Sequence, residues 1–427
     1  MRIAISTGGG DAPGLNSVIR SATLAALRRG WDVTGIRDGF NGLMFPDDYP
    51  ESGGTVALTR EYVRGIGHLG GTVLGSTNRG DPTNFPVQQP DGSWTYVDRT
   101  TELVGLFEEA GIEALITIGG DGSLLIGQKL SEAGLRVVGV PKTIDNDLAM
   151  TDTTFGFDTA VEVATEGIDR LFTTATSHSR VFVVEVMGRY AGWIALNSGV
   201  AAGAHAILIP EIPYDLDTVA NAIESRQARG ARFAIVVVAE GAKAKDGERS
   251  VIGKSVGQAE RLGGVGAHVA QELEHLTGKE VRTMVLGHLL RGGTPSSRDR
   301  LLGVRFGTAA VRGLEDGHRG VMVALQPPHV SYVPLVSAIS KMRTVPLDCD
   351  TILAARDLGI SFGDAACAQP VKPASLWEPS HRGFEPDWPQ RHRVTRLRDS
   401  SALPSARSTP TPPLTHSGPS GIAAISD

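Results

Sequence analysis

The sequence predicts a three-layer α/β protein with two lobes, and three observations support this prediction. The chain has 427 residues, which is more than a single small core needs. Along it, short apolar runs typical of strands buried on both faces alternate with amphipathic segments. The two clearest amphipathic segments finish at glycine, a residue favoured just after a helix end. We therefore expect mainly parallel sheets that are covered by helices on both faces.

The expected elements are taken in chain order. The strands are "RIAIS", "ALITIGG", "RVVGV", "VFVVEVM", "HAILIP", "FAIVVVAE" and "VMVAL", which cover residues 2–6, 114–120, 136–140, 181–187, 205–210, 233–240 and 321–325. The helices are expected over residues 15–30 and 216–230. In such sheets ligands bind beyond the carboxyl ends of the strands. Residues that directly follow a strand are therefore the first candidates for function.

Charge and composition exclude several classes of protein. A net charge of -6 argues against a general nucleic-acid or membrane-surface binder, because either needs clustered Lys and Arg. Two cysteines cannot form a disulfide framework, which is typical of a reducing compartment. The start "MRIAISTGGG" has no signal-peptide pattern, and no apolar run approaches the roughly 18 residues that span a bilayer. We expect a cytoplasmic protein.

The last segment, residues 365–427, differs from the rest. It loses apolar periodicity and holds ten of the 24 prolines. Such a composition cannot bury enough surface to offset the entropy of ordering, so we expect disorder. A dispensable extension and an interaction tail are both compatible with this segment.

Two glycine-rich turns follow expected strands. The first, "STGGGDAPGLN", allows close backbone approach to a ligand, and Pro13 suits the first turn of the helix after it. Backbone N–H groups and the helix dipole would favour a phosphate there. The second, "ITIGGDGSLL", exposes Asp121 and offers Ser123 as a helix cap. Either turn alone could be a tight connection without a ligand.

The next strand ends in "PKTIDND", which makes the two turns more informative. This stretch brings Asp145 and Asp147 close to Lys142 and Thr143. Two neighbouring carboxylates repel each other unless a cation or a proton lies between them. Mg²⁺ prefers one or two carboxylates together with phosphate oxygens and water. A glycine cradle, a metal carboxylate and a candidate base are the parts that phosphoryl transfer needs.

Six stretches in this order resemble the 6-phosphofructokinase family of the A type over roughly residues 1 to 364. They are "GGGDAPGLN", "IGGDGS", "PKTIDND", "VEVMGRYAGWIA", "VVAEGAK" and "VLGHLLRGGTPSSRDR". The resemblance implies a glycolytic kinase that phosphorylates the 1-hydroxyl of fructose 6-phosphate. It also implies two Rossmann-like α/β/α domains with the active site in the cleft between them, in a homotetramer or dimer whose sites are completed across an interface. We expect residues 1–156 plus 290–340 to bind nucleotide and Mg²⁺, and 157–289 plus 341–364 to bind the sugar phosphate.

The resemblance also implies roles for single residues near the transferred group. Asp145 resembles the general base, and Asp147 the second family aspartate close to it. Thr143 would hydrogen-bond the transferring phosphoryl group, and Asp121 would hold Mg²⁺ through its water shell. Arg189 resembles the arginine that stabilises transition-state charge.

A second set of residues matches the sugar-phosphate site of the family. Four basic residues match the positions that hold the 6-phosphate, some of which reach over from a neighbouring subunit in relatives: Arg180, Arg282, His288 and Arg291. Glu240 resembles the carboxylate that binds sugar hydroxyls, with Met187 and Gly188 lining the same pocket. A solvated surface charge is the alternative for each arginine, and a hydrogen-bonded core residue is the alternative for His288.

The remaining expected residues face the donor. Gly10, Phe40 and Arg79 resemble residues that contact nucleotide phosphate, base and phosphate, and the turn with Gly120, Asp121, Gly122 and Ser123 completes this site. Phe40 could equally belong to the core. Ile126 stands where nucleotide-using relatives often have glycine.

The choice of donor depends on two positions. Pyrophosphate users of the family commonly have aspartate at the position of Gly122 and lysine at that of Lys142, whereas most ATP users have glycine at both. This chain carries glycine and lysine. An aspartate would block and repel the α-phosphate of ATP, whereas Lys142 aids either donor, so ATP with Mg²⁺ is predicted and pyrophosphate is the alternative.

Two rival functions remain at this point. NAD and lipid kinases of related fold share the glycine-aspartate-glycine turn but would not be expected to have the later motifs in this order. A non-catalytic sugar-phosphate sensor would be expected to lack the base, and Asp145 is present.

Overall fold

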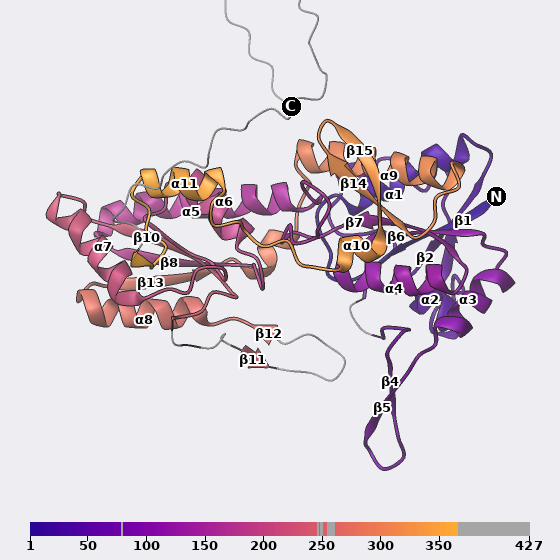
Figure 1. The fold of residues 1–427 in the computed structure, drawn as a ribbon, viewed down its shortest axis with the longest axis horizontal. Helices are drawn as coiled ribbons and strands as arrows, with labels where there is room; N and C mark the ends of the chain where they lie inside the picture. The colour runs from indigo at the N-terminus through magenta and orange to yellow at the C-terminus, as the bar shows by residue number, and fades with distance from the viewer. Residues whose placement is uncertain (78–79, 246, 248–250, 254–260, 366–427) are drawn as a thin grey trace, which may run out of the picture. The chain divides into compact units, whose positions relative to one another are not determined.

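The computed structural model describes residues 1–77, 80–245, 247, 251–253 and 261–365. The described residues belong to one compact unit. This unit contains two sheets of mainly parallel strands, each with helices packed on it (Figure 1). The predicted α/β fold class is confirmed.

The larger sheet contains the N-terminal strand near its centre. In the described part of the chain its spatial order is β15 (His329–Pro334), β14 (Val321–Gln326), β7 (Arg136–Pro141), β6 (Ala114–Gly119), β1 (Arg2–Thr7), β2 (Asp32–Ile36) and β3 (Thr55–Ala57). The five inner strands pair in parallel, and the edge strands β15 and β3 pair antiparallel. In this register β1, β6 and β7 end side by side, which brings the three predicted site turns together.

Alternation along the strands explains why helices cover both faces of this sheet. Ile3 and Ile5 of β1 pack into one core with α1 (Leu15–Leu27) and α9 (Ser297–Glu315). Ala4, between them, packs into the opposite core with α3 (Thr100–Glu109), α4 (Asp121–Glu132) and α10 (Leu335–Ile339). Successive side chains of a strand point to opposite faces of the sheet. Because helices cover both faces, the side chains on both faces must be apolar.

The second sheet repeats this arrangement. It contains β13 (Val281–Val285), β8 (Val181–Val186), β10 (Ala234–Ala239) and β9 (Ala206–Leu208), all paired in parallel. One face is covered by α5 (Phe157–His178), α6 (Trp193–Ala201) and α11 (Asp350–Asp357), and the other by α7 (Leu216–Ala228) and α8 (Val265–Thr277).

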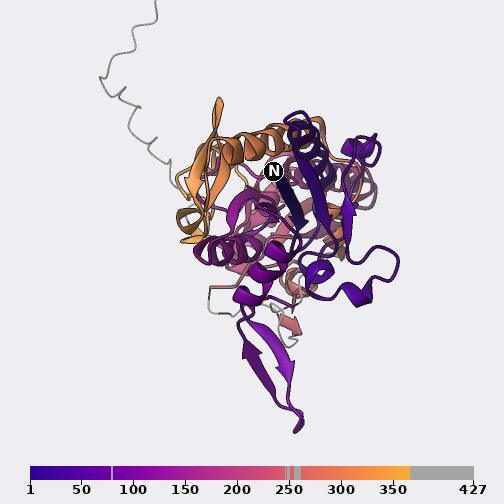
Figure 2. The ribbon, with the colours of Figure 1, turned by 90° about the vertical axis from the view of Figure 1, so that its right-hand side faces the viewer.

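Short elements complete the description. They are α2 (Asn41–Met44), the 3-10 turns η1 (Pro46–Asp48), η2 (Ile66–His68) and η3 (Gly287–Arg291), and the antiparallel pairs β4 (Phe85–Gln88) with β5 (Trp94–Val97) and β11 (Val251–Gly253) with β12 (Arg261–Leu262). The β4–β5 ribbon stands away from the sheets in both views (Figures 1 and 2). At its base the guanidinium of Arg99 lies 4.9 Å from the centre of the Phe85 ring.

The structure confirms the seven expected strands and both expected helices, and it corrects two local details. Helix α1 begins at Leu15 after Gly14, so Pro13 lies before the helix and not in its first turn. Helix α4 begins at Asp121, so Ser123 is its third residue and does not cap it.

Some expectations stay predictions. The division of residues 1–364 into two domains is one of them. The segment expected to be disordered lies, from residue 366 onward, outside the described residues. Among the helices that the structure describes, none combines the length and apolarity needed to cross a bilayer.

Candidate active site

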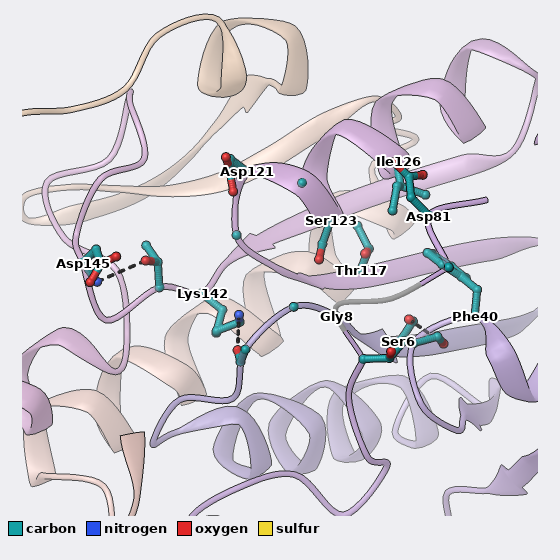
Figure 3. Close-up of a pocket in the computed structure, with 18 of the residues that line it drawn as sticks. Ser6, Gly8, Phe40, Asp81, Thr117, Asp121, Ser123, Ile126, Lys142 and Asp145 are labelled. Atoms are coloured by element: carbon teal, nitrogen blue, oxygen red, sulfur yellow. Dashed lines mark hydrogen bonds between the residues drawn. The ribbon is translucent and has the colours of Figure 1, made fainter. Parts of the chain in front are cut away.

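A cavity of about 510 Å³ lies at the carboxyl ends of strands from both sheets (Figure 3). The turns after β1, β6 and β7 form one wall, and residues that follow β8 and β10 reach it from the other sheet. The predicted site residues that line it are Gly10, Phe40, Gly120, Asp121, Gly122, Ser123, Lys142, Thr143, Asp145, Asp147, Arg189, Glu240 and Arg291. The structure therefore brings these strand ends together around one cavity.

The loop after β7 presents both aspartates to the cavity through a local turn. The hydroxyl of Thr143 accepts a hydrogen bond from the backbone N–H of Asp145 at 3.1 Å. Asn146 adopts a left-handed conformation with φ of 52°, which its short polar side chain tolerates. Its side-chain oxygen also accepts from the backbone N–H of Thr154 at 3.1 Å, which anchors the turn. Asp145 and Asp147 flank this turn and both line the cavity.

Asp145 is the most perturbed carboxyl group of the cavity. Burial and, to a smaller extent, the charges of Asp147 and Glu240 together raise its pKa to about 7, although Arg291 and Arg189 oppose the shift. Burial and the charge of Asp121 also raise the pKa of Asp147. One oxygen of Asp145, Oδ1, is buried without a hydrogen-bond partner among the described residues. A buried carboxylate oxygen in this state is suited to accept a proton or hydrogen bond from a ligand.

Lys142 joins two of the strand-end turns. Its ammonium Nζ donates to the carbonyl of Gly10 at 2.5 Å, as Figure 3 shows. Burial and the nearby charge of Arg291 lower its pKa to about 8. At neutral pH the side chain is therefore mostly protonated, and it supplies a buried cation between the first glycine turn and the aspartate loop.

The second glycine turn packs closely against the sheet but stays open toward the cavity. A Cβ on Gly119 would lie 2.2 Å from that of Ser123, and one on Gly8 would lie 2.5 Å from its hydroxyl, so both positions need glycine. At Gly122, by contrast, an added Cβ would meet no atom within 4 Å. Ser123 therefore packs the turn in place, and Gly122 leaves free space in the cavity wall.

Asp121 and Asp147 are the residues that fit a magnesium ion. Both line the cavity, and their charges interact. Within the described residues no cluster of three or more metal-ligating side chains is present. Mg²⁺ often binds through one or two carboxylates while keeping several waters and contacting ligand phosphates. The donor set therefore fits a phosphate-bound Mg²⁺ and not a closed protein cage.

The end of the cavity far from Asp145 combines apolar and polar side chains. Phe40, Ile126 and Asp81 lie there in Figure 3. Phe40 is a core residue, with its ring edge-to-face with Phe107 at 6.4 Å, and it also lines the cavity. Sequence reasoning missed Asp81, although "GDPTN" is a typical turn sequence. Its carboxylate accepts from the backbone and hydroxyl of Thr83 at 2.8 and 2.9 Å.

Charged residues from the second sheet and from η3 face the aspartate loop. Arg189 and Glu240 follow β8 and β10, and burial raises the pKa of Glu240 while Arg189 opposes the shift. Arg291 donates to the carbonyl of Asp11 at 3.0 Å. A Cβ on Gly10 would lie only 2.9 Å from the Arg291 guanidinium, so glycine permits this close approach. Tyr190, which sequence reasoning did not single out, lies beside Arg189 and also lines the cavity.

Five predicted residues do not line this cavity, and a sixth cannot be placed. Arg180 and Arg282 both pair with Glu280, the former at 2.5 Å. Met187 belongs to the core of the second sheet. The others outside the cavity lining are Gly188 and the exposed His288, and Arg79 lies outside the described residues.

Comparison with known proteins decides the family. The family model described as "Phosphofructokinase" matches residues 2–314 of this chain. The chain belongs to the phosphofructokinase family. An ATP-dependent 6-phosphofructokinase of Chloroflexus aggregans is 50% identical over 363 residues, which are 85% of this chain and 98% of the relative. A pyrophosphate–fructose 6-phosphate 1-phosphotransferase of Streptomyces coelicolor is 49% identical over 367 residues, 85% of this chain and 100% of the relative.

A solved structure supports the same assignment. The phosphofructokinase of Saccharomyces cerevisiae superimposes with a TM-score of 0.66 at 29% identity, over 79% of this chain. The match covers 45% of the yeast chain, so this phosphofructokinase spans about half of its length. The predicted family is thus confirmed. Relatives named for ATP and for pyrophosphate are almost equally similar, so overall identity does not decide the donor.

Proposed function

We propose that this phosphofructokinase transfers the γ-phosphoryl group of Mg-ATP to the 1-hydroxyl of fructose 6-phosphate. The observation that carries the proposal is Asp145, whose buried Oδ1 lacks a partner in the described structure and whose pKa is raised to about 7. A general base works best when its pKa lies near the operating pH. Its neighbours supply a lysine, a threonine and an open glycine turn, which suit a polyphosphate.

The proposed reaction uses the groups of the cavity in defined roles. The sugar hydroxyl oxygen bonds to the γ-phosphorus, the bond from phosphorus to the leaving ADP oxygen breaks, and the hydroxyl proton passes to ionised Asp145. Arg189 and Lys142 offset charge on the transferred group, and Thr143 hydrogen-bonds it. Asp121, with Asp147 close to it, would hold Mg²⁺, which supplies charge neutralisation on the phosphates.

The choice of ATP rests on Gly122. The free space at its Cβ position leaves room for a phosphate beyond the two that pyrophosphate contains. Pyrophosphate remains the alternative donor, since Lys142 would serve it equally. The test is kcat/KM in an aldolase-coupled assay with each donor in Mg²⁺. ATP should be the better donor, and a tenfold or greater preference for pyrophosphate would overturn this assignment. No activity with any donor would favour a sugar-phosphate sensor.

We further propose a homo-oligomer in which Arg180, Arg282 and His288 serve the 6-phosphate site of a neighbouring subunit. Their position outside the cavity of their own chain supports this. So does the exposed apolar surface of β13 and η3, which includes Met284, Val285 and Leu289. Light scattering coupled to size-exclusion chromatography should give a dimer or tetramer, and a purely monomeric active enzyme would contradict the proposal.

The expectations about cellular location and binding partners are proposals as well. We propose a cytoplasmic enzyme with small-molecule partners and no nucleic-acid or membrane partner. The net charge of -6 supports the absence of a nucleic-acid or membrane partner, because a polyanion or an anionic surface would be repelled.

A further inference from the structure

Arg343 lies behind the aspartate loop and holds its backbone. The N–H of Arg343 donates to the carbonyl of Asp147 at 2.8 Å, and its guanidinium Nη1 donates to the carbonyl of Asn146 at 3.3 Å. Leu148 and Met342 form an antiparallel bridge beside these contacts. A segment almost 200 residues away in sequence therefore binds the two carbonyls that directly follow Asp145.

The same arginine also contacts the loop that carries Arg189. The indole N–H of Trp193 donates to the carbonyl of Arg343 at 3.1 Å. The guanidinium carbon of Arg343 lies 4.5 Å from the centre of the Trp193 ring, within the range of a cation–π interaction. Trp193 is the fourth residue after Arg189 and the first of α6.

Glu211 reinforces this connection by binding Val345, two residues after Arg343. Its carboxylate accepts from the backbone N–H of Val345 at 2.8 Å and from that of Gly192 at 3.0 and 3.1 Å. A Cβ on Gly192 would lie 2.4 Å from Ile209 and 2.9 Å from this carboxylate, so the contact needs glycine. Residues 343–345 are thus attached to both loops at once.

These contacts join two walls of the cavity that come from different sheets. Asp145 and Asp147 follow a strand of the larger sheet, and Arg189 follows a strand of the smaller one. None of the contacts of Arg343 described above is made with Asp145 or Arg189 themselves. A side chain that binds the backbone of one loop and stacks on an aromatic ring of the other can set the separation of base and arginine without touching substrate.

We propose that Arg343 is a positioning residue that fixes the Asp145 loop relative to the Arg189 loop. The effect of this positioning on phosphoryl transfer rests on the proposed function. A planar guanidinium can stack on Trp193 and donate to a carbonyl at the same time. A lysine ammonium keeps the positive charge but lacks the planar group that makes both contacts. Arg343 therefore acts through geometry, and charge alone does not replace it.

The test compares Arg343→Met and Arg343→Lys with a matched control, Arg356→Met. Arg356 also stacks on an aromatic ring, that of Phe362 at 5.0 Å, and it pairs with Asp364 at 2.7 Å outside the cavity lining. Both Arg343 variants should lose kcat about tenfold to hundredfold with less than a threefold change in the KM for fructose 6-phosphate. The control should lower only thermal stability.

A second readout separates this proposal from the proposed function. Hydrogen–deuterium exchange in the full chain should speed up in peptides covering residues 145–154 and 189–193 for both Arg343 variants, and not for Arg356→Met. Unchanged exchange there, or full activity in both variants, would overturn the proposal. If the wild type transfers no phosphoryl group, the proposed function fails, and the exchange data still decide whether Arg343 couples the loops. If the methionine variant does not fold, the lysine variant carries both measurements.

Discussion

Replacing Gly122 with aspartate gives the sharpest test of how this enzyme selects its donor. The position is the second residue of α4, and an added Cβ there meets no atom within 4 Å. The fold should therefore accept the change, and an acidic group in the first turn of a helix contributes about 0.3–1 kcal/mol of stability. The new carboxylate would occupy space in the cavity wall where the polyphosphate of ATP is expected.

The size of the effect follows from charge repulsion. Two unit charges about 4 Å apart repel by about 4 kcal/mol at the effective dielectric constant of a protein surface. Since about 1.4 kcal/mol is a tenfold change, kcat/KM for ATP should fall about a thousandfold through charge alone, and crowding adds to the loss. The assay is ATP-dependent turnover beside a thermal melt. The variant Gly122→Asn has a side chain of the same size as aspartate but no charge, so its loss of activity measures the effect of crowding alone. A loss below tenfold in a folded aspartate variant would refute the reasoning.

Three further predictions follow. Asp145→Ser should lower kcat about 100-fold or more with a nearly unchanged KM for fructose 6-phosphate. It should also remove the rise in wild-type activity that is expected as pH increases through about 7. An effect mainly on KM would contradict the role of base. Arg282→Ala should weaken fructose 6-phosphate binding by about 2–4 kcal/mol, measured by titration, and unaltered binding would exclude Arg282 from the phosphate site. Truncation after Asp364 keeps the Arg356–Asp364 ion pair and should preserve melting temperature and activity; loss of either would show that the tail packs.

Thermal stability supplies a second check on Asp145. Its folded pKa is raised from 3.8 to about 7, so between these values the folded state binds more protons than the unfolded state. This group's contribution to stability is therefore largest below pH 4 and falls as pH rises to about 7. Asp145→Ser should consequently change the melting temperature more favourably at pH 8 than at pH 5, because the loss of side-chain volume costs the same at both pH values.

The sequence was most informative where a signal is local. Buried parallel strands are apolar on both faces, so β1, β6 and β7 could be read from short runs, and the residues after them followed from the rule for strand ends. The edge strand β13 was missed because four of its five residues are exposed and it shows no such run. The β4–β5 ribbon was missed because every residue of β5 is exposed.

Contacts between distant segments could not be predicted from the sequence. Nothing near Lys142 in sequence indicates that its ammonium reaches the carbonyl of Gly10, 132 residues away. The left-handed turn at Asn146 depends on Thr154 and Arg343, which only the folded chain brings together. The resemblance named Arg282 as a phosphate ligand, yet in a single chain it pairs with Glu280.

The position of Arg291 makes ligand binding and proton uptake interdependent. Its positive charge lowers the pKa of Lys142 and also that of Asp145, two groups that titrate near neutral pH. An anion that pairs with this guanidinium neutralises its field, so both pKa values rise and protons are taken up from solution. By thermodynamic reciprocity, the same anion binds more tightly as the medium becomes more acidic. In the proposed reaction ionised Asp145 is the base, so acidification would tighten phosphate binding and at the same time protonate the base beside it.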